Sequence, residues 1–290
     1  MIQRKVYNSA FLLPALALYT IFFIVPVVSG IGFSFTDWNN LKTKISFVGL
    51  ANYFSIFQSD SGPYLLSLLN TFLFTFFTVL LKTACGLLLA LMLNANFRSK
   101  NVLRTLFFST YTLAPLIIGI IFVSILSGTG MLNTLLSSVG LEGLTTPWLS
   151  NPATALASTM LVEVWRMAGW NMIIFLAGLQ MIPKDFYEAA EIDGANAYHQ
   201  FVKITVPFLM PAITVALVLN TIHGLKVFEI IYALTGGGPG SLTEVINTLV
   251  FREFADGRYG MSNALAVVVF LVTLVVAVFM RKKLSGEEQE

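Results

Sequence analysis

Long apolar runs alternate with shorter polar segments along the whole chain. A helix needs about 20 apolar residues to cross a bilayer core that is about 30 Å thick. Six runs reach roughly this length, and none shows the strong period-two alternation of a membrane β-barrel. The pattern therefore predicts six transmembrane helices. We expect them to cover residues 10–35, 66–93, 103–126, 153–179, 207–234 and 264–280.

A polar segment, residues 183–206, lies between the fourth and fifth predicted spans. Pro183 suits the first position of a helix of about two turns. Asp193 and Gly194 form a strong helix breaker, in which the glycine can adopt the left-handed conformation. A second short helix is predicted after this turn, and we expect it to end at Pro207, where the chain re-enters the membrane. The segment is thus predicted to be a helical hairpin.

Clusters of Lys and Arg orient the predicted spans. With six spans, four clusters fall on one side of the membrane, and the positive-inside rule places that side in the cytoplasm. Both termini and the hairpin are therefore predicted to be cytoplasmic. The clusters are Arg4 and Lys5; Arg98, Lys100 and Arg104; Lys184 and Lys203; and Arg281, Lys282 and Lys283.

The composition agrees with a chain that is surrounded by a lipid bilayer. Hydrophobic residues make up 56% of the 290 residues and charged residues only 11%, against about 25% charged in soluble domains. The net charge of +2 gives no reason to expect a nucleic-acid partner. The single cysteine, Cys85, rules out a disulfide framework and a cysteine-based metal site. We expect an all-α membrane protein with a single domain over residues 1–290.

The hairpin also follows a spaced pattern. It reads Glu188-Ala189-Ala190, three residues, Gly194, nine residues, and then Ile204-Thr205-Val206-Pro207. This pattern resembles the EAA loop of binding-protein-dependent ABC import permeases, which usually have leucine at the position of Val206. Residues 46–53 (SFVGLANY) resemble a stretch after the first helix of sugar permeases, and residues 234–240 (LTGGGPG) resemble a loop of their MalF-type subunits. Together the resemblance covers residues 11–283.

The resemblance implies a fold and a set of partners. The fold would be that of a type I ABC importer permease with six transmembrane helices and both termini inside, in the bacterial plasma (inner) membrane. The partners would be a second, homologous permease subunit (MalG-like), two ABC ATPase subunits and an extracytoplasmic solute-binding protein. In that family the EAA loop is a coupling helix that docks on the ATPase. The docking residues carried over to this chain are Glu188, Ala189, Ala190, Asp193 and Gly194.

The chain has no phosphate-binding motif of the form Gly-x-x-x-x-Gly-Lys-Ser/Thr. ATP and Mg²⁺ are therefore expected to be used by the partner ATPase, and this chain is expected to bind no cofactor. It is predicted to be a transport subunit and not an enzyme. A membrane-embedded enzyme has no support, because the sequence contains no Gly-x-Ser-x-Gly motif and no paired-histidine motif.

Charged residues inside the predicted spans need an account, because each costs about 2.5–3.5 kcal/mol on insertion scales. Glu163 and Arg166 are three residues apart in the fourth span and can pair on one helix face. The pair is either a self-satisfied structural feature or, with Trp170 and Asn171, part of the polar lining of a solute path. Lys82 in the second span is expected to pair with a residue of another helix or of the partner subunit.

A second set of polar residues follows the fifth span in steps of three, which would place them on one slowly drifting helical stripe. Their amide, imidazole, ammonium and carboxylate groups could bind the hydroxyl groups of a sugar, and two aromatic rings could stack on its apolar face. Alternatively, the chain has left the membrane from His223 onward and is merely solvated. No second histidine lies at ligand spacing, so we expect no metal site. The residues are Asn220, His223, Lys226 and Glu229, with Phe228 and Tyr232.

Two functions remain. The favoured one is a permease subunit of an ATP-driven ABC importer that moves a carbohydrate, a di- or oligosaccharide, by alternating access. We expect an uncharged sugar, because a phosphate would call for more intramembrane Arg or Lys. The alternative is an ion-coupled secondary transporter of a small polar solute, in which Glu163 and Lys82 would relay protons or ions.

Overall fold

Helices form almost all of the regular structure. The computed structural model describes residues 12–41, 44–58 and 62–286, and within these ranges it has one isolated antiparallel bridge and no β-strand. The chain is thus all-helical, as predicted. Outside the described residues lie the start of the first predicted span (residues 10 and 11) and the N-terminal basic residues Arg4 and Lys5.

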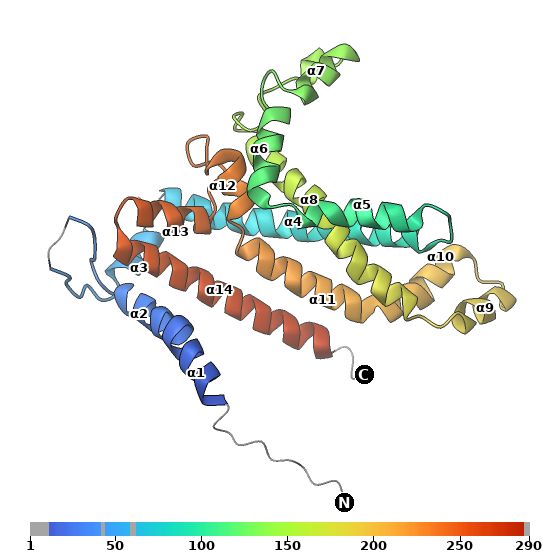
Figure 1. Cartoon of the computed structure of the whole chain (residues 1–290), viewed down its shortest axis with the longest axis horizontal. Helices are drawn as coiled ribbons and strands as arrows, with labels where there is room; N and C mark the ends of the chain where they lie inside the picture. The colour runs from blue at the N-terminus through green and yellow to red at the C-terminus, as the bar shows by residue number, and fades with distance from the viewer. Residues whose placement is uncertain (1–11, 42–43, 59–61, 287–290) are drawn as a thin grey trace, which may run out of the picture. The chain divides into compact units, whose positions relative to one another are not determined.

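Contacts within the chain group it into two compact units, and each is described by itself. The first unit comprises residues 1–61 and 249–270, and the second comprises residues 62–248 and 271–290. The expectation of a single domain stays a prediction. The elements of Figure 1 are α1 (Leu13–Tyr19), the π-helical turn η2 (Thr20–Ile24), α2 (Val25–Phe33), α3 (Ala51–Phe57), α4 (Gly62–Asn94), α5 (Lys100–Thr112), α6 (Pro115–Ile125), α7 (Met131–Ser138), the 3₁₀ turn η3 (Glu142–Leu144), α8 (Ala155–Gln180), α9 (Asp185–Ile192), α10 (Ala197–Gln200), the π-helical turn η4 (Phe201–Thr205), α11 (Val206–Leu225), α12 (Glu229–Thr235), α13 (Ile246–Ala255) and α14 (Tyr259–Gly286).

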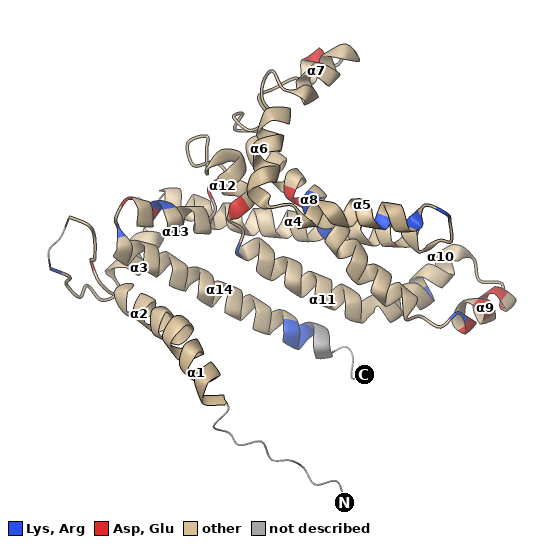
Figure 2. Ribbon diagram, viewed as in Figure 1, with Lys and Arg blue, Asp and Glu red and all other residues tan. Residues whose placement is uncertain are grey.

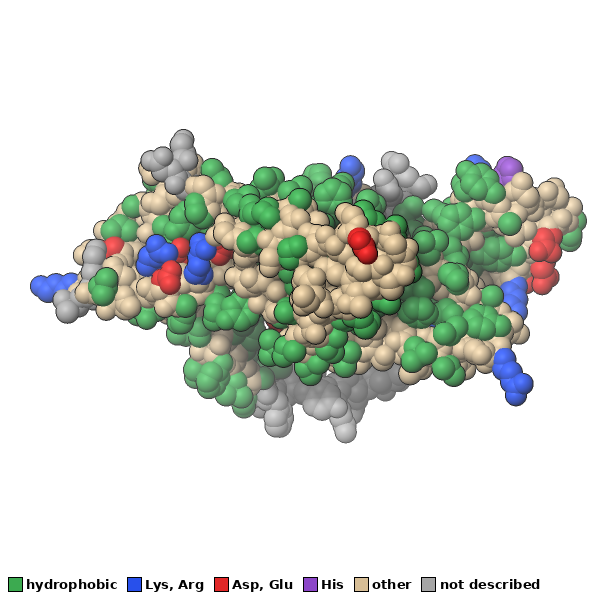
Figure 3. Space-filling view, turned by 90° about the horizontal axis from the view of Figure 1, so that it is seen from above, with side chains coloured by type: hydrophobic (Ala, Val, Ile, Leu, Met, Phe, Trp, Pro, Cys, Tyr) green, Lys and Arg blue, Asp and Glu red, His purple; other side chains and the backbone are tan. Residues whose placement is uncertain are grey.

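Five helices are long and apolar enough to cross a membrane, and a bent helix pair would make a sixth span. Of these, α4, α8 and α14 coincide with the second, fourth and sixth predicted spans apart from their ends. Large hydrophobic side chains are widely exposed along the helices, as the green atoms of Figure 3 show for one face. Lipid or another protein must cover such a surface, since soluble monomers rarely expose large apolar patches.

The prediction of one continuous helix over residues 103–126 is wrong. The chain forms α5 and α6 instead, and their axes differ by 97°. Ala114 between them is extended, with φ −61° and ψ 133°. The residue before a proline disfavours the helical conformation, whereas Pro115 suits the first turn of the next helix. The unbroken apolar composition hid this bend.

The fifth predicted span, 207–234, is also wrong at both ends. The helix that could span the membrane runs from Ala197 to Leu225, and residues 229–235 form the separate helix α12. Phe228 between them leaves the helical region, with φ −145° and ψ −64°. The predicted polar stripe is therefore divided between α11 and the start of α12, and it does not continue along one helix.

The prediction that Pro207 ends the second helix of the hairpin is wrong. Elements α10, η4 and α11 are continuous, and the π-helical turn η4 ends immediately before Val206-Pro207. Proline lacks an N–H group and clashes with the preceding turn of a regular α-helix, and a local π turn relieves this conflict. The first span repeats the arrangement, because η2 is followed by Val25-Pro26.

In the first unit, the motif at residues 46–53 ties the end of α2 to α3. Asn52 donates hydrogen bonds from Nδ2 to the carbonyl oxygens of Ser34 at 2.8 Å and Thr36 at 2.9 Å. The hydroxyl groups of Tyr53 and Ser34 are 2.6 Å apart. These contacts satisfy carbonyl groups that the end of a helix leaves without intrahelical partners.

In the second unit, α8 packs along α4, and α5 and α11 pack against these two helices (Figure 1). Two glycines permit the close approach. A Cβ atom on Gly86 of α4 would lie 3.0 Å from the backbone carbonyl carbon of Asn171 in α8. A Cβ atom on Gly224 of α11 would lie 2.9 Å from Cγ2 of Thr75 in α4. Small residues let transmembrane helices pack backbone to backbone, so α4 packs closely against both α8 and α11.

Candidate functional site

Glu163 of α8 is surrounded by basic residues from three helices. Its Oε1 lies 3.6 Å from Nζ of Lys82 on α4 and 2.9 Å from Nε2 of His223 on α11. Arg166, one turn further along α8, donates from Nε to Oε2 at 3.0 Å and from Nη2 to Oε1 at 3.1 Å. We call these four residues the charged cluster. One carboxylate thus joins three helices of the second unit.

Three members of the charged cluster are buried between two apolar layers. Lys82 and Glu163 have no exposed surface, and Arg166 is 6% exposed. On α4 the cluster lies between buried Phe74 and Ala90, which belong to different hydrophobic clusters. Buried charges that lose a partner are strongly destabilising, so the four side chains are expected to depend on one another.

The contacts of Glu163 test the predicted partners of Arg166 and Lys82. The predicted pairing of Glu163 with Arg166 is confirmed, with geometry that uses both carboxylate oxygens. For Lys82, whose partner is expected on another helix or in a partner subunit, the structure supplies Glu163 on α8. The 2.9 Å contact assigns the proton of His223 to Nε2, because the carboxylate can only accept a hydrogen bond.

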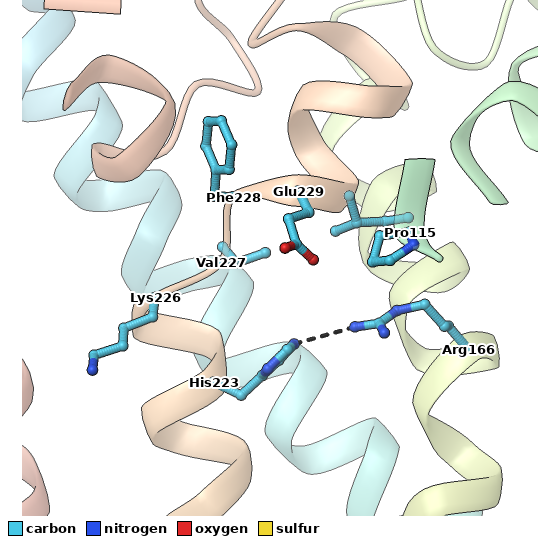
Figure 4. A pocket seen from close by; sticks show the side chains of 8 residues that line it. Pro115, Arg166, His223, Lys226, Val227, Phe228 and Glu229 are labelled. Atoms are coloured by element: carbon cyan, nitrogen blue, oxygen red, sulfur yellow. Dashed lines mark hydrogen bonds between the residues drawn. The ribbon is translucent and has the colours of Figure 1, made fainter. Parts of the chain in front are cut away.

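A pocket of about 270 Å³ opens beside the charged cluster. In Figure 4 the side chains of Arg166 and His223 point toward each other, 3.3 Å apart at Nη2 and Nε2, and the carboxylate of Glu229 points into the space above them. Lys226 contributes to the wall, but its ammonium group points away from Arg166 (Figure 4). The lining residues are Pro115, Arg166, His223, Lys226, Val227, Phe228, Glu229 and Ile230.

The pocket brings together only part of the predicted solute path. Arg166, His223, Lys226, Phe228 and Glu229 line it, and Glu163 lies behind Arg166 and His223. His223 is 40% exposed at its side chain and bonded to the cluster, so it is not merely solvated. Sequence reasoning missed Pro115, Val227 and Ile230. The Ala114-Pro115 dipeptide was the available signal for the bend that brings α6 to this place.

Asn171 and Asn220 contact each other and not the pocket. Asn220 donates from Nδ2 to Oδ1 of Asn171 at 2.6 Å, and both residues have no exposed surface. Asn171 also donates to the carbonyl oxygen of Met167 at 3.1 Å. The two amides therefore satisfy one another in the interface between α8 and α11. Their role in a solute path stays a prediction.

The predicted aromatic residues pair with other rings. The rings of Phe228 and Tyr232 are stacked, with centroids 5.3 Å apart. In Figure 4 the ring of Phe228 points away from Arg166 and His223. Trp170 on α8 lies against Tyr111 of α5, with ring centroids 6.0 Å apart. Stacking of these rings on a sugar would require them to separate or to use their outer faces.

The hairpin agrees with its predicted turn. Gly194 has φ +76°, in the left-handed region that favours glycine, and α9 ends immediately before Asp193. Asn196 then begins α10, accepting a hydrogen bond at Oδ1 from the backbone N–H of His199 at 2.9 Å. Most of the proposed docking residues are exposed, and Ala190 is half-buried. Ile192, between them, is 88% exposed.

Among the described residues, no group of three or more His, Cys, Asp or Glu side chains is placed to hold a metal ion. The polar side chains that line the pocket offer hydrogen-bond donors and acceptors. Arg166 uses Nε and Nη2 for Glu163, which leaves the Nη1 amino group for another acceptor. Glu229 offers a carboxylate acceptor across the same pocket.

Comparisons with known proteins agree with one another. Residues 82–282 match the family model described as "Binding-protein-dependent transport system inner membrane component". The trehalose/maltose transport system permease protein MalF of Thermococcus litoralis is 36% identical over 270 residues, which cover 91% of this chain and 88% of that protein. The arabinooligosaccharides transport system permease protein AraP of Bacillus subtilis is 33% identical, with 98% and 90% covered.

A solved structure has the same fold over nearly the whole chain. A chain from the crystal structure of a bacterial ABC transporter involved in the import of the acidic polysaccharide alginate superposes with a TM-score of 0.82. The sequence identity is 28%, and the superposition covers 95% of this chain and 94% of the other. A second structure of that kind of transporter, in complex with an alginate pentasaccharide-bound periplasmic protein, gives a TM-score of 0.81 at 27% identity.

Proposed function

Because the chain belongs to the family of binding-protein-dependent transport system inner membrane components, we propose that it is the permease subunit of an ATP-driven ABC importer for a carbohydrate. It is a multi-pass protein of the plasma membrane with a type I ABC importer permease fold. The observation that carries the proposal is the match over nine tenths of the chain to permeases whose names specify sugars.

The alternative of an ion-coupled secondary transporter is wrong, because members of this family work with a solute-binding protein. The two residues that the alternative would have used as ion relays, Lys82 and Glu163, are paired with each other. Both are fully buried, and neither Lys82 nor Glu163 lines the pocket beside the charged cluster. Their arrangement fits a structural joint between helices better than a relay that must exchange protons with water.

The hairpin is the proposed docking surface for an ATPase subunit. Acidic residues gather on α9, as the red segments of the ribbon in Figure 2 show, and the small residues Ala189 and Ala190 let a partner backbone come close. Ile192 is 88% exposed and offers an apolar anchor beside them. A buried apolar anchor surrounded by polar contacts is typical of the centre of a protein interface. Glu188, Asp193 and Gly194 complete the surface.

The proposed assembly supplies what this chain lacks. Two ABC ATPase subunits bind and hydrolyse ATP with Mg²⁺, and this chain binds no cofactor itself. A second, homologous MalG-like permease completes the translocation path, and an extracytoplasmic solute-binding protein delivers the sugar. ATP binding closes the ATPase pair and moves the hairpins, so that the two permeases alternate between inward-facing and outward-facing states.

The pocket beside the charged cluster is the proposed contact point for the sugar within this subunit. A donor from Arg166 and an acceptor from Glu229 line the same pocket, which is the combination that hydroxyl groups need. A volume of about 270 Å³ lies below the range of about 300–1,000 Å³ for drug-sized ligands, so it suits one part of a di- or oligosaccharide.

Reconstitution tests the proposal. The chain would be placed in proteoliposomes with its partner permease, its ATPase subunits and its binding protein, and ATP-dependent uptake of labelled di- and oligosaccharides would be measured. We expect uptake that requires ATP inside and binding protein outside. Uptake that persists without ATP and collapses with an uncoupler would contradict the proposal. Titration of the binding protein with candidate sugars identifies the cargo.

A glycine pair tests the docking surface. Gly194→Val in the hairpin should abolish stimulation of ATP hydrolysis by the loaded binding protein. Gly140→Val is the matched control, because Gly194 and Gly140 have φ values of +76° and +80°, and a Cβ atom added to either would meet no atom within 4 Å. Both changes therefore impose the same backbone strain. Equal loss of stimulation in the two variants would remove the support for docking at the hairpin.

A further inference from the structure

A groove of about 440 Å³ lies between α11 and the C-terminal part of α14 in the second unit. Thr214, Val215, Val218 and Leu219 form one wall, and Ala277, Val278 and Arg281 form the other. Val215 lies three and four positions before Val218 and Leu219. Arg281 lies three and four positions after Val278 and Ala277, so each wall is one helix face. The groove is separate from the pocket beside the charged cluster, with which it shares no lining residue.

The groove combines an apolar slot with a cation at its mouth. Val215, Leu219 and Val278 are 49%, 43% and 47% exposed, so their side chains are not covered by the rest of the chain. Arg281 is the first charged residue after a long apolar stretch of α14, and Lys282 and Lys283 follow it directly. All three basic side chains are exposed.

Arg281 has no carboxylate near it in the described part of the chain. None of the groove residues is acidic, and no ion pair joins Arg281 to a described residue. A guanidinium group at a membrane surface binds phosphate through paired N–H donors. Basic pockets between transmembrane helices on the cytoplasmic side bind anionic lipid headgroups.

We propose that this groove is a binding site for an anionic phospholipid. One acyl chain lies in the slot between α11 and α14, and the phosphate group binds Arg281, with Lys282 and Lys283 adding attraction for the negative headgroup. The apolar walls select an acyl chain, and the arginine selects a charged headgroup. The occupant is thus a single class of molecule, because neither a free phosphate ion nor a neutral lipid uses both features.

The test uses the purified full chain in neutral phosphatidylcholine nanodiscs that are titrated with phosphatidylglycerol. Native mass spectrometry counts the lipid that stays bound, and thermal unfolding reports the stabilisation. Arg281→Gln removes the cation, and Ala277→Phe fills the slot and keeps the cation. Lys283→Gln is the matched control, because Lys283 carries the same charge near the same helix end but does not line the groove.

We expect Arg281→Gln to weaken phosphatidylglycerol binding by more than about fivefold, the diffuse effect of one basic residue at a membrane surface. Ala277→Phe should weaken it at least as much, and Lys283→Gln should change it less than either. Equal effects of Arg281→Gln and Lys283→Gln would mean diffuse surface attraction and would overturn the proposal. An Ala277→Phe variant that binds phosphatidylglycerol normally would overturn it as well.

Two further measurements separate the occupant from other candidates. Glycerol 3-phosphate, which has the phosphate but no acyl chain, should fail to displace phosphatidylglycerol, and displacement would point to a free phosphate site. Unfolding in phosphatidylcholine alone shows that each variant is folded. A Val218→Cys variant should not cross-link to the second permease in the assembled importer. Efficient cross-linking would show that the second permease, and not a lipid, occupies the groove.

Discussion

Tyr187 of α9 and Thr205 of the π-helical turn η4 share a hydrogen bond of 2.9 Å between their hydroxyl groups. The bond joins the two arms of the hairpin beside the point where the second arm becomes α11. Thr205 is 5% exposed, so water competes little for this contact. The hairpin is therefore attached to the long helix in two ways, through the continuous backbone and through this side-chain bond.

Tyr187→Phe removes this bond and keeps the ring. We expect a loss of about 0.5–1.5 kcal/mol, the usual net contribution of a hydrogen bond. Hydrogen exchange should become faster in residues 185–205, with little change in α8. Tyr198→Phe is the control, because Tyr198 is 71% exposed. If the two variants exchange alike, the bond does not hold the hairpin.

Replacing Glu163 should destabilise the protein more than replacing Lys82, although both residues of the charged cluster are fully buried. Glu163→Leu leaves Lys82 and Arg166 without the carboxylate and should cost about 3–5 kcal/mol, as for a broken buried pair. Lys82→Met leaves Glu163 paired with Arg166 and should cost less. Adding Lys82→Met to Glu163→Leu should restore part of the stability, because one uncompensated cation is removed.

Unfolding of the three variants in detergent micelles measures the order of their stabilities. If the uncompensated charge of Lys82 causes the loss, the double variant must be more stable than Glu163→Leu alone. A double variant that loses the sum of the two single effects would show instead that Lys82 and Glu163 act independently.

A larger side chain at Gly86 should destabilise the packing of α4 against α8. Gly86→Val would force a side chain into the backbone of Asn171 and should cost about 1–3 kcal/mol or more. Gly32→Val in α2 is the control, since no atom lies within 4 Å of a Cβ at that position. Thermal unfolding compares them. A similar shift for both would reflect helix propensity and not helix packing.

The local features of the chain were predictable from its sequence. The pairing of Glu163 with Arg166 needs only the spacing of three residues within one helix. The turn at Gly194 needs only the absence of a Cβ atom. Each of these depends on residues that are neighbours along the chain, so helix geometry alone determines which groups meet.

Other features depend on packing or on small changes of helical winding. Lys82 finds Glu163 only because Gly86 lets α4 approach α8, and no periodicity in the sequence specifies which helices are neighbours. The continuity of the helix through Pro207 depends on the π-helical turn before it, which the apolar pattern does not reveal. The division of the polar stripe at Lys226 likewise results from the end of α11.

The unbroken helix from Ala197 to Leu225 connects the hairpin at one end with His223 near the other end. Its 29 residues, at about 1.5 Å each, span about 43 Å. A tilt of about 5° about the hairpin end displaces the far end by about 3–4 Å at this length. That displacement exceeds the 2.9 Å that separates His223 from Glu163. A slight rotation at the hairpin is therefore enough to break a buried contact near the far end of the same helix.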